Sequence, residues 1–447
     1  MNQKNTAALY EAAIHYIYDI PKFTKKGGIV QTAALMAMIG NPQEDFKYIH
    51  VAGTNGKGSV CAFIERGLRS LGVKTGLFTS PHLIKINERI QINGEMISDE
   101  DFLWLFDTVK EKVDAYVLNG GVHPTFFEWM YMMAMLWFKR QNVSWAVVET
   151  GLGGRLDATN VICEPEITVI TSIGFDHMQY LGSDLKSIAG EKAGIIKRGA
   201  PLVYDTSCKE AAAVISERFK AVNKKSVSSC KDCVPVSRKM AKNCCILNDG
   251  IEYDTMLDGI DLRMHLSMLG NYQLDNSLIA LHTLGILGKK NQYFGLKKDV
   301  FYRCITGAFK NTVWAGRMEK INAHLYIDGA HNEAGIKALA ETMKVRFACE
   351  KVYLLFAVAE DKDYDQMIRT LCDVKNINGV MVTAIDSERK TDTKKVADLF
   401  EKYGHAPVKQ TYNIKEALQA AVQWTGSDIL CCCGSLYLAG SIKEILL

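Results

Sequence analysis

A glycine-rich segment early in the chain has the residue types that bind phosphate groups. The short apolar run 48–51 is followed by Gly53, Thr54, Asn55, Gly56, Lys57, Gly58 and Ser59, and residues 60–70 have a helix-like pattern. A strand, a glycine-rich turn and a helix N-terminus form an anion site, because backbone N–H groups can approach phosphate oxygens and the helix dipole favours negative charge. Lys57 would then reach the β- and γ-phosphates, and the Ser59 hydroxyl would face a metal ion.

The match to the phosphate-loop pattern GxxxxGK[ST] is imperfect. Val51 occupies the place of the first glycine, and Gly58 separates Lys57 from Ser59. A glycine-rich turn without a ligand is the alternative interpretation. The strand before the segment and the helix after it are the context that this motif requires, and they favour phosphate binding.

Polar residues stand at the ends of three further apolar runs. The runs are 75–79, 145–149 and 167–172, and the polar residues are Ser80 and His82, Glu149, and Asp176 and His177. In open α/β sheets, ligands bind beyond the carboxyl ends of the strands, so we expect these side chains to meet the glycine-rich loop. A hydroxyl and a carboxylate there would suit Mg²⁺, which prefers oxygen ligands; an imidazole is a less usual ligand. Taken singly, each residue has an ordinary explanation, such as an ion pair between Glu149 and Arg155.

The stretch 149–160 is the densest polar segment that follows a strand. Arg155 could bind a carboxylate or phosphate through two parallel hydrogen bonds. Asp157 and Asn160 could bind substrate or cap a helix, and the residue types alone leave both interpretations open.

The alternation of apolar runs with helix-like stretches predicts an α/β fold with a mostly parallel sheet. We expect a phosphate-loop ATPase domain at residues 1–310, a linker at 311–316, and a smaller Rossmann-like α/β domain at 317–447. Residues 205–265 suggest a small β insertion in the first domain, with a hairpin turn at 248–250. A cleft between two such domains is a natural ligand site.

The second domain repeats the pattern of polar residues after apolar runs. The runs are 325–327, 352–358, 380–385 and 429–432, and the polar residues that follow them are Asp328, His331 and Asn332, Asp361 and Asp363, Asp386 and Ser387, and Ser435. We therefore expect a second substrate to bind at the edge of this domain.

Composition excludes several classes of function. The formal net charge of +3 over 447 residues gives no argument for nucleic-acid or membrane binding. The longest apolar run, 129–138, is too short to span a bilayer and predicts a buried helix. Residues 1–23 lack the apolar core of a signal peptide, which predicts a cytoplasmic protein. Cys230, Cys233, Cys244 and Cys245 loosely match a zinc ribbon, but the odd total of 13 cysteines favours reduced thiols.

Eight short motifs together resemble the folylpolyglutamate synthase family, which is related to the Mur ligases. They are GTNGKGS at 53–59, SPHL at 80–83, NERI at 87–90, GLGGRLDATN at 151–160, DH at 176–177, EKAGI at 191–195, GRME at 316–319 and DGAHN at 328–332. The resemblance extends from about residue 19 to residue 438. One departure is Ala315, which stands before Gly316 where the family commonly has proline.

The resemblance implies roles for particular residues. ATP phosphates would bind at the loop from Gly53 to Ser59, and Lys57, Lys192 and His177 would be catalytic. The nucleotide would also be contacted by Asn276, Arg317, Asp328 and His331. Two Mg²⁺ ions would be held by Ser80, Glu149, His177 and a carbamylated Lys192. The folate substrate would lie near Phe127, Glu128, Arg155, Leu156, Asp157 and Ala158.

The activity implied by the resemblance is ATP-dependent addition of L-glutamate to the γ-carboxylate of folates through an acyl phosphate. The motifs leave open whether the chain also joins glutamate to dihydropteroate. They do not give the oligomeric state, for which we expect a monomer. Two alternatives remain: a Mur-type ligase acting on another carboxylate, and a non-catalytic nucleotide-binding protein. The latter would not need the combination of Ser80, Glu149 and His177.

Overall fold

The computed structural model describes residues 3–20, 28–224, 232–386 and 389–447. An eight-stranded sheet forms the centre of the N-terminal part, with the strand order β4-β3-β2-β5-β1-β6-β7-β8. The pairs from β2 to β8 are parallel, and β3 and β4 are added antiparallel at one edge. The strands are β1 (Lys47–Ala52), β2 (Thr75–Phe78), β3 (Ile90–Ile92), β4 (Glu95–Met96), β5 (Trp145–Glu149), β6 (Ile167–Ile170), β7 (Leu202–Asp205) and β8 (Cys233–Val236).

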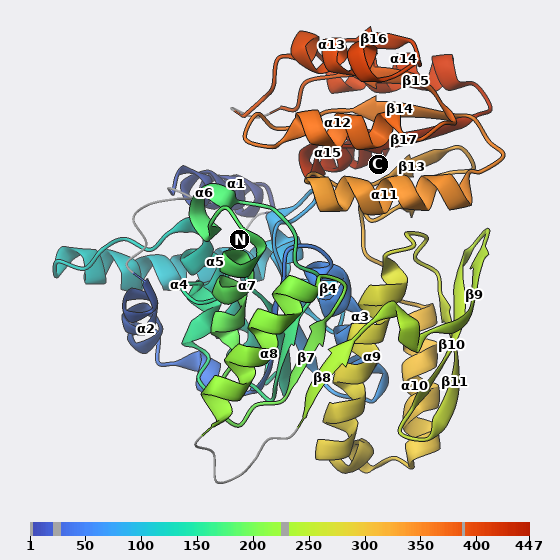
Figure 1. Ribbon diagram of the computed structural model, residues 1–447. Helices are drawn as coiled ribbons and strands as arrows, with labels where there is room; N and C mark the ends of the chain where they lie inside the picture. Colours follow the sequence, from blue (N-terminus) through green and yellow to red (C-terminus); the bar gives the residue numbers. More distant parts are fainter. Residues whose placement is uncertain (1–2, 21–27, 225–231, 387–388) are drawn as a thin grey trace.

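Helices cover both faces of this sheet (Figure 1). They are α1 (Gln3–Asp19), α2 (Gly28–Met38), α3 (Lys57–Ser70), α4 (Asp99–Leu118), α5 (Phe126–Arg140), α6 (Met178–Leu181), α7 (Leu185–Lys192), α8 (Lys209–Asn223), α9 (Gln273–Lys290) and α10 (Lys298–Lys310). Short 3₁₀ helices lie at Pro42–Glu44, Ile86–Arg89, Ala158–Val161, Ala193–Ile195, Arg238–Met240 and Gln292–Gly295. Within the described residues, no helix is long and apolar enough to cross a membrane.

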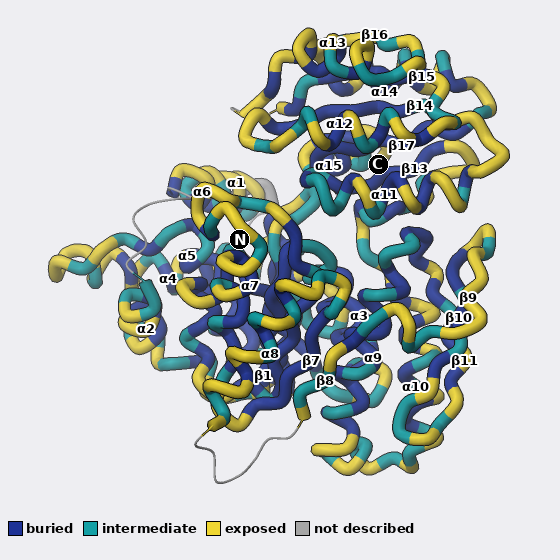
Figure 2. The backbone as a smooth tube through the Cα atoms, in the orientation of Figure 1, coloured by how far each residue is buried: buried dark blue, intermediate teal, exposed yellow. Residues whose placement is uncertain are grey.

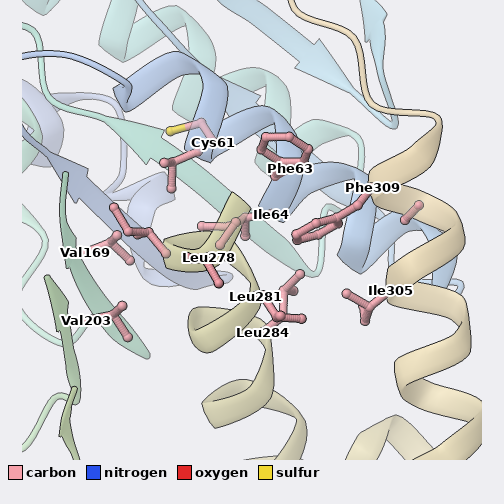
Figure 3. Packing of buried hydrophobic residues seen from close by; sticks show 14 of the residues in the cluster. Cys61, Phe63, Ile64, Val169, Val203, Leu278, Leu281, Leu284, Ile305 and Phe309 are labelled. Atoms are coloured by element: carbon pink, nitrogen blue, oxygen red, sulfur yellow. The ribbon is translucent and has the colours of Figure 1, made fainter. Parts of the chain in front are cut away.

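The alternation of side chains along the strands gives the sheet two apolar faces. In β5, Val147 packs with α3, α9 and α10 on one face, whereas Ala146 and Val148 pack with α1, α4 and α5 on the other. The first of these cores is shown in Figure 3, where Phe63 of α3 contacts Phe309 of α10 at a ring-centroid distance of 4.8 Å. The run 129–138 lies in the buried helix α5, as the sequence predicts.

A separate antiparallel sheet packs beside α9 and α10. It consists of β9 (Lys242–Leu247), β10 (Gly250–Leu257) and β11 (Ile260–Leu266). The predicted hairpin turn is confirmed, because only residues 248 and 249 separate β9 from β10. Tyr253 and Met264 point inward and are fully buried against the α3–α9–α10 core.

The predicted β insertion at 205–265 is too wide. Strand β8 falls inside that range but is part of the main sheet, and helix α8 packs against that sheet. The extra sheet therefore occupies only residues 242–266. The reason is visible in α8, where Ala211, Ile215 and Phe219 recur every four residues and form an apolar stripe. That stripe packs against the core formed by β6, β7 and α7.

The C-terminal part contains a six-stranded sheet with the order β12-β13-β17-β14-β15-β16. Its strands are β12 (Glu319–Lys320), β13 (Leu325–Ile327), β14 (Val352–Phe356), β15 (Ile377–Val382), β16 (Val408–Gln410) and β17 (Ile429–Cys433). Its helices are α11 (Glu333–Arg346), α12 (Tyr364–Cys372), α13 (Thr393–Tyr403), α14 (Ile414–Thr425) and α15 (Leu436–Leu446). All its pairs are parallel except β12 with β13, and each face has its own apolar core, so the predicted α/β architecture is confirmed. The backbone of β14, inside this sheet, is mostly buried (Figure 2).

The described cysteines range from buried to exposed. Cys431 and Cys433 pack into one core of the C-terminal part and Cys432 into the other, so all three behave as small apolar residues. Cys244 and Cys245 are exposed on β9. Cys230 and Ser387 lie outside the described residues.

Candidate functional site

The glycine-rich loop connects β1 to α3 at the carboxyl edge of the main sheet. Gly56 has φ +84°, and a Cβ there would collide with the side-chain oxygen of Asn276. A Cβ on Gly58 would lie 2.7 Å from the indole nitrogen of Trp314. Glycine is therefore required at both positions by close approach, and at Gly56 also by backbone conformation. The Thr171 hydroxyl donates to Asn55 O at 2.7 Å, which ties the loop to the end of β6.

A buried carboxylate lies beside this loop. Glu149, at the end of β5, is 3% exposed; its Oε1 lies 3.8 Å from Lys57 Nζ, and its Oε2 accepts from Ser80 N at 3.2 Å. Burial raises the pKa of Glu149, while the positive charge of Lys57 partly offsets this effect. The ends of β1, β2 and β5 thus bring together Lys57, Ser80 and Glu149.

Lys192 is a second buried amine at the loop. It is 4% exposed and donates from Nζ to Gly53 O at 2.8 Å. Burial, followed by the charge of Lys57, lowers the pKa of Lys192 to about 7. A neutral amine is therefore well populated near pH 7. Glu191, the partner that would make Lys192 an ordinary ion pair, bonds to Arg155 instead at 2.8 Å.

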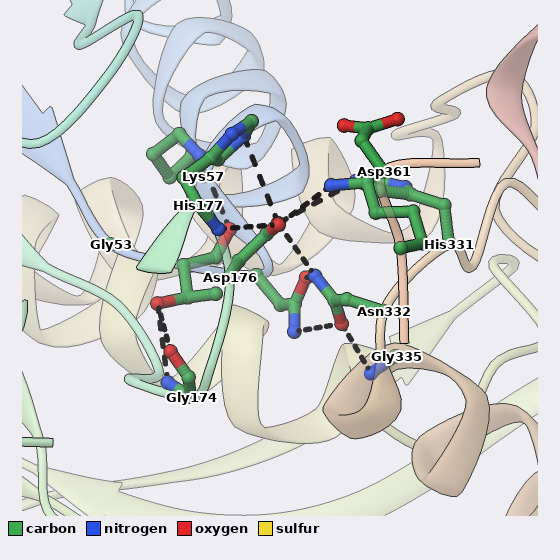
Figure 4. A network of polar contacts seen from close by, with 12 residues as sticks. Gly53, Lys57, Gly174, Asp176, His177, His331, Asn332, Gly335 and Asp361 are labelled. Carbon is green, nitrogen blue, oxygen red and sulfur yellow. Dashed lines mark hydrogen bonds and ion pairs between the residues drawn. The ribbon is translucent and has the colours of Figure 1, made fainter. Parts of the chain in front are cut away.

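A set of polar residues that we call the interdomain cluster joins the loop side to the C-terminal part (Figure 4). It consists of Asn55, Asp176, His331, Asn332 and Lys362. Asp176 Oδ1 accepts a hydrogen bond from Lys362 Nζ at 2.6 Å, and Asp176 Oδ2 accepts one from Asn332 Nδ2 at 2.9 Å. His331 Nε2 lies 3.8 Å from Asp176 Oδ2. Asn55 and Asn332 exchange two amide hydrogen bonds of 3.1 and 3.0 Å.

The electrostatics of this cluster centre on Asp176. Burial alone would raise the pKa of Asp176, but His331, His177 and Lys362 together hold it well below its ordinary value. His177 has φ +50° and is the N-cap residue that precedes α6, with Nε2 at 3.8 Å from Asp176 Oδ1. Burial lowers the pKa of His177, so its ring is mainly neutral near pH 7. The ion pair between Asp176 and Lys362 is not predictable from the sequence, since 186 residues separate them.

Asp328 directly follows β13 and is almost fully buried. Its carboxylate accepts from Tyr272 Oη at 2.5 Å, Met318 N at 2.8 Å and Ala330 N at 2.8 Å. Arg317 donates to Gly316 O at 3.1 Å. His331 donates from Nδ1 to Gly329 O at 2.8 Å, and burial lowers the pKa of His331 to about 4.

The start of α9 contacts the loop from the other side. Asn276 Nδ2 donates to Gln273 Oε1 at 2.9 Å, and Gln273 Nε2 donates to Ser59 Oγ at 3.2 Å. Gln273 is fully buried. Sequence analysis missed it, and its only signal was its position three residues before Asn276.

Two of the predicted folate-side residues, Glu128 and Asp157, form hydrogen bonds with other residues of the chain. Glu128 caps α5 by accepting from Thr125 N at 2.9 Å, and it also accepts from Thr32 Oγ1 at 2.7 Å. Asp157 accepts from Thr159 N at 3.0 Å and from Leu152 N at 2.9 Å, as expected for the helix-capping alternative.

The remaining four folate-side residues differ in exposure. Arg155 and Leu156 are exposed, Phe127 is half-buried and Ala158 is buried.

Arg89 is a further residue that sequence analysis did not single out as a site residue. It is 7% exposed, donates from Nε to His82 Nδ1 at 2.8 Å, and lies 5.0 Å from the centroid of the Phe126 ring. Burial lowers the pKa of Arg89 to about 10. Its guanidinium forms no ion pair within the described part of the chain. A buried cation of this kind is suited to an anionic ligand.

These groups fit a magnesium–nucleotide complex. The loop offers backbone N–H groups and an ammonium group to phosphates, as helix N-termini do. Burial raises the pKa of the Glu149 carboxyl, and a cation bound beside Glu149 and Ser80 would favour its ionised form.

The chain is similar to known proteins over almost its whole length. Residues 51–284 match the Mur ligase middle domain, and residues 316–436 match the Mur ligase glutamate ligase domain. A dihydrofolate synthase/folylpolyglutamate synthase of Bacillus subtilis is 35% identical over 451 residues, which cover 98% of this chain and 99% of the relative.

Solved structures give the same result. The folylpolyglutamate synthase of Mycobacterium tuberculosis complexed with ADP has a TM-score of 0.86 at 29% identity, with 98% of each chain covered. An FPGS–AMPPCP–folate complex has a TM-score of 0.83 at 28% identity, covering 98% of this chain and 99% of that one.

Proposed function

Because this chain belongs to the folylpolyglutamate synthase and dihydrofolate synthase family of Mur ligases, we propose that it joins L-glutamate to the γ-carboxylate of folates at the expense of ATP. It is an ATP-dependent ligase that forms a carbon–nitrogen bond. The observation that carries the proposal is the meeting of Lys57, Glu149 and Lys192 at one loop. This loop also contacts the C-terminal part through Asn55 and Asn332.

The chemistry requires activation of a carboxylate. The γ-carboxylate of the folate attacks the γ-phosphorus of ATP, which gives an acyl phosphate and ADP. The amine of glutamate then attacks the acyl carbon, loses a proton and displaces phosphate. The loop N–H groups and Lys57 stabilise the charge on the phosphates during the first step.

Magnesium would supply further charge neutralisation at the transferred phosphoryl group. Ser80, Glu149 and His177 would hold one ion. Ser59 would contribute its hydroxyl at the phosphates. The nucleotide is also proposed to contact four residues that the resemblance implies, which are Asn276, Arg317, Asp328 and His331.

Lys192 is proposed to carry a carbamate that holds a second Mg²⁺. A neutral amine reacts with CO₂ and loses a proton, which converts a potential cation into a carboxylate. The lowered pKa of Lys192 supports this step, because the reactive neutral form is present near pH 7. A protonated Lys192 beside Lys57 would instead repel any metal ion.

Arg89 is proposed to bind a carboxylate of the folate substrate. Its guanidinium is buried beside His82 and Phe126 and interacts electrostatically with Glu149. A carboxylate bound there would be the direct ion-pair partner that this guanidinium lacks among the described residues.

We propose two domains, residues 1–310 and 317–447, with residues 311–316 as the hinge. The C-terminal domain would bind glutamate at the edge that carries Asp328, His331 and Lys362. Closure of the two domains would shield the acyl phosphate from water. We further propose a cytoplasmic monomer that accepts dihydropteroate as well as folates, since the Bacillus subtilis relative is named for both activities.

The test measures phosphate release and product mass with tetrahydrofolate plus glutamate and, separately, with dihydropteroate plus glutamate. Addition of one glutamyl residue in both reactions supports the bifunctional proposal, and addition only to tetrahydrofolate limits it to chain elongation. ATP binding without substrate-stimulated phosphate release would support a non-catalytic protein instead. Release stimulated only by another carboxylate would support a different Mur-type ligase. Lys57→Ala is the inactive control.

A further inference from the structure

Three side chains from the loop and α9 form one continuous hydrogen-bonded chain. Asn276 Nδ2 donates to Gln273 Oε1 at 2.9 Å, and Gln273 Nε2 donates to Ser59 Oγ at 3.2 Å. Gln273 is fully buried, and Ser59 and Asn276 are 1% and 6% exposed. Both ends of the Gln273 carboxamide are therefore used, and its orientation is fixed by its two neighbours.

We propose that Gln273 is a positioning residue that orients the Ser59 hydroxyl and the Asn276 carboxamide for the magnesium–nucleotide complex. The inference rests on the proposed function only in taking that complex as the ligand of the loop. Gln273 does not touch the nucleotide in this proposal; it acts through the two residues that do.

The hydroxyl chemistry explains why an amide is needed. A serine hydroxyl has one hydrogen and two lone pairs. Because Gln273 Nε2 donates to Ser59 Oγ, one lone pair is occupied. One lone pair and the hydrogen are left, so the hydroxyl can bind a cation and donate to a phosphate oxygen at the same time. Without Gln273, the hydroxyl would rotate freely among these uses.

The Asn276 carboxamide is set by the same residue. Its nitrogen is occupied by Gln273, so its oxygen is the end that faces Gly56. A flipped Asn276 would place two donors against the loop and leave Gln273 Oε1 without its partner. Gln273 thus determines that the Asn276 oxygen, a hydrogen-bond acceptor, faces the glycine-rich loop.

The position of α9 is held from outside the nucleotide site. One turn beyond Gln273, Ser277 Oγ shares a 2.8 Å hydrogen bond with Tyr253 Oη of β10. Tyr253 is fully buried in the core that the small sheet forms with α9 and α10. The extra sheet therefore supports the helix that supplies Gln273, which gives this appended element a part in the site.

The test measures binding of the non-hydrolysable nucleotide AMPPCP by titration calorimetry, with Mg²⁺ and with EDTA. We expect Gln273→Met to bind Mg–AMPPCP about tenfold more weakly than the wild type, and to lose less affinity in EDTA. The matched control is Thr283→Val, which removes a buried hydroxyl bond within the same helix, to Ile279 O at 2.8 Å, and should leave both affinities unchanged.

A double-mutant cycle with Ser59→Ala separates positioning from general damage to the fold. If Gln273 acts through Ser59, Gln273→Met costs less than half of its wild-type effect when Ser59 is already alanine. Equal losses in both backgrounds, or an unchanged affinity of Gln273→Met, overturn the inference. Gln273→Glu, which can still accept from Asn276 but reverses the bond to Ser59, serves if Gln273→Met does not fold, and the same weakening is expected.

Failure of this inference and failure of the proposed function give different results. A wild-type protein that binds Mg–AMPPCP but forms no glutamylated product refutes the proposed function and leaves the role of Gln273 intact. A wild-type protein that ligates glutamate while Gln273→Met binds nucleotide normally refutes only the role of Gln273.

Discussion

Arg346 offers a direct test of how the C-terminal part is attached to the rest of the chain. It lies in the last turn of α11 and donates four hydrogen bonds to three backbone carbonyls across the boundary. The acceptors are Leu247 at 2.6 Å, Gly250 at 3.2 Å, and Leu269 at 3.2 and 2.9 Å. We predict that Arg346→Met destabilises the protein more than any exposed arginine substitution.

The magnitude follows from the carbonyls that are left behind. Gly250 and Leu269 are buried residues, and Leu247 is half-buried. Without Arg346, the buried carbonyls of Gly250 and Leu269 lose this donor, whereas water can replace it at the half-buried Leu247. A buried carbonyl without a partner costs about 1–3 kcal/mol, so the two together give a loss on the order of 3 kcal/mol. Burial lowers the pKa of Arg346, because removing the cation from water is unfavourable. The net stabilisation by Arg346 is therefore smaller than the sum of four hydrogen bonds from a charged group.

Thermal unfolding measures the effect. We expect Tm to fall by roughly 3 °C for Arg346→Met, because the loss on the order of 3 kcal/mol is divided by an unfolding entropy of about 2.1 cal/mol/K per residue over 447 residues. The matched control is Arg303→Met, whose partner Asp299 lies 3.0 Å away on the exposed face of α10; such pairs contribute about 0–1 kcal/mol. If the two variants melt within about 1 °C of each other, the carbonyl contacts of Arg346 do not stabilise the boundary and the reasoning is wrong.

Three further predictions concern the site. Lys192→Ala should abolish ligation, and short carboxylic acids should partly restore it; full activity of the unsupplemented variant in a phosphate-release assay would exclude the carbamate. Gly56→Ala should weaken nucleotide binding at least tenfold by calorimetry, because its Cβ collides with Asn276 at φ +84°, and unchanged binding would show that the loop relaxes. Arg89→Met should raise the KM for folate by about tenfold or more while leaving nucleotide affinity unchanged, and an unaltered folate KM in steady-state kinetics would remove the proposed carboxylate contact.

The fold was predictable where a short apolar run is buried on both faces. The runs 145–149 and 325–327 coincide with β5 and β13, because every residue of these strands is buried and the apolar run therefore has the same ends as the strand. Residues 205–236 were misread as part of a β insertion, because β8 is an edge strand with partly exposed residues and gives only a weak apolar signal.

The sequence predicts the site residues that follow the strands. It does not predict the residues from distant elements that contact them. Lys57 and Glu149 follow from the rule that strand ends converge, and they lie 3.8 Å apart. Lys362 reaches Asp176 only because two sheets are docked, and Gln273 reaches Ser59 only because α9 packs on α3. Those contacts depend on packing between distant elements, for which one sequence carries no local pattern.

The amide pair between Asn55 and Asn332 makes the phosphate loop one of the surfaces that hold the two halves of the molecule together. Occupancy of the loop and the relative orientation of the halves are then linked equilibria. By thermodynamic reciprocity, if a nucleotide changes the strength of this contact by some factor, breaking the contact changes nucleotide affinity by the same factor. The size of this coupling is measured as the difference in nucleotide affinity between the wild type and a variant without the amide pair, without observing catalysis.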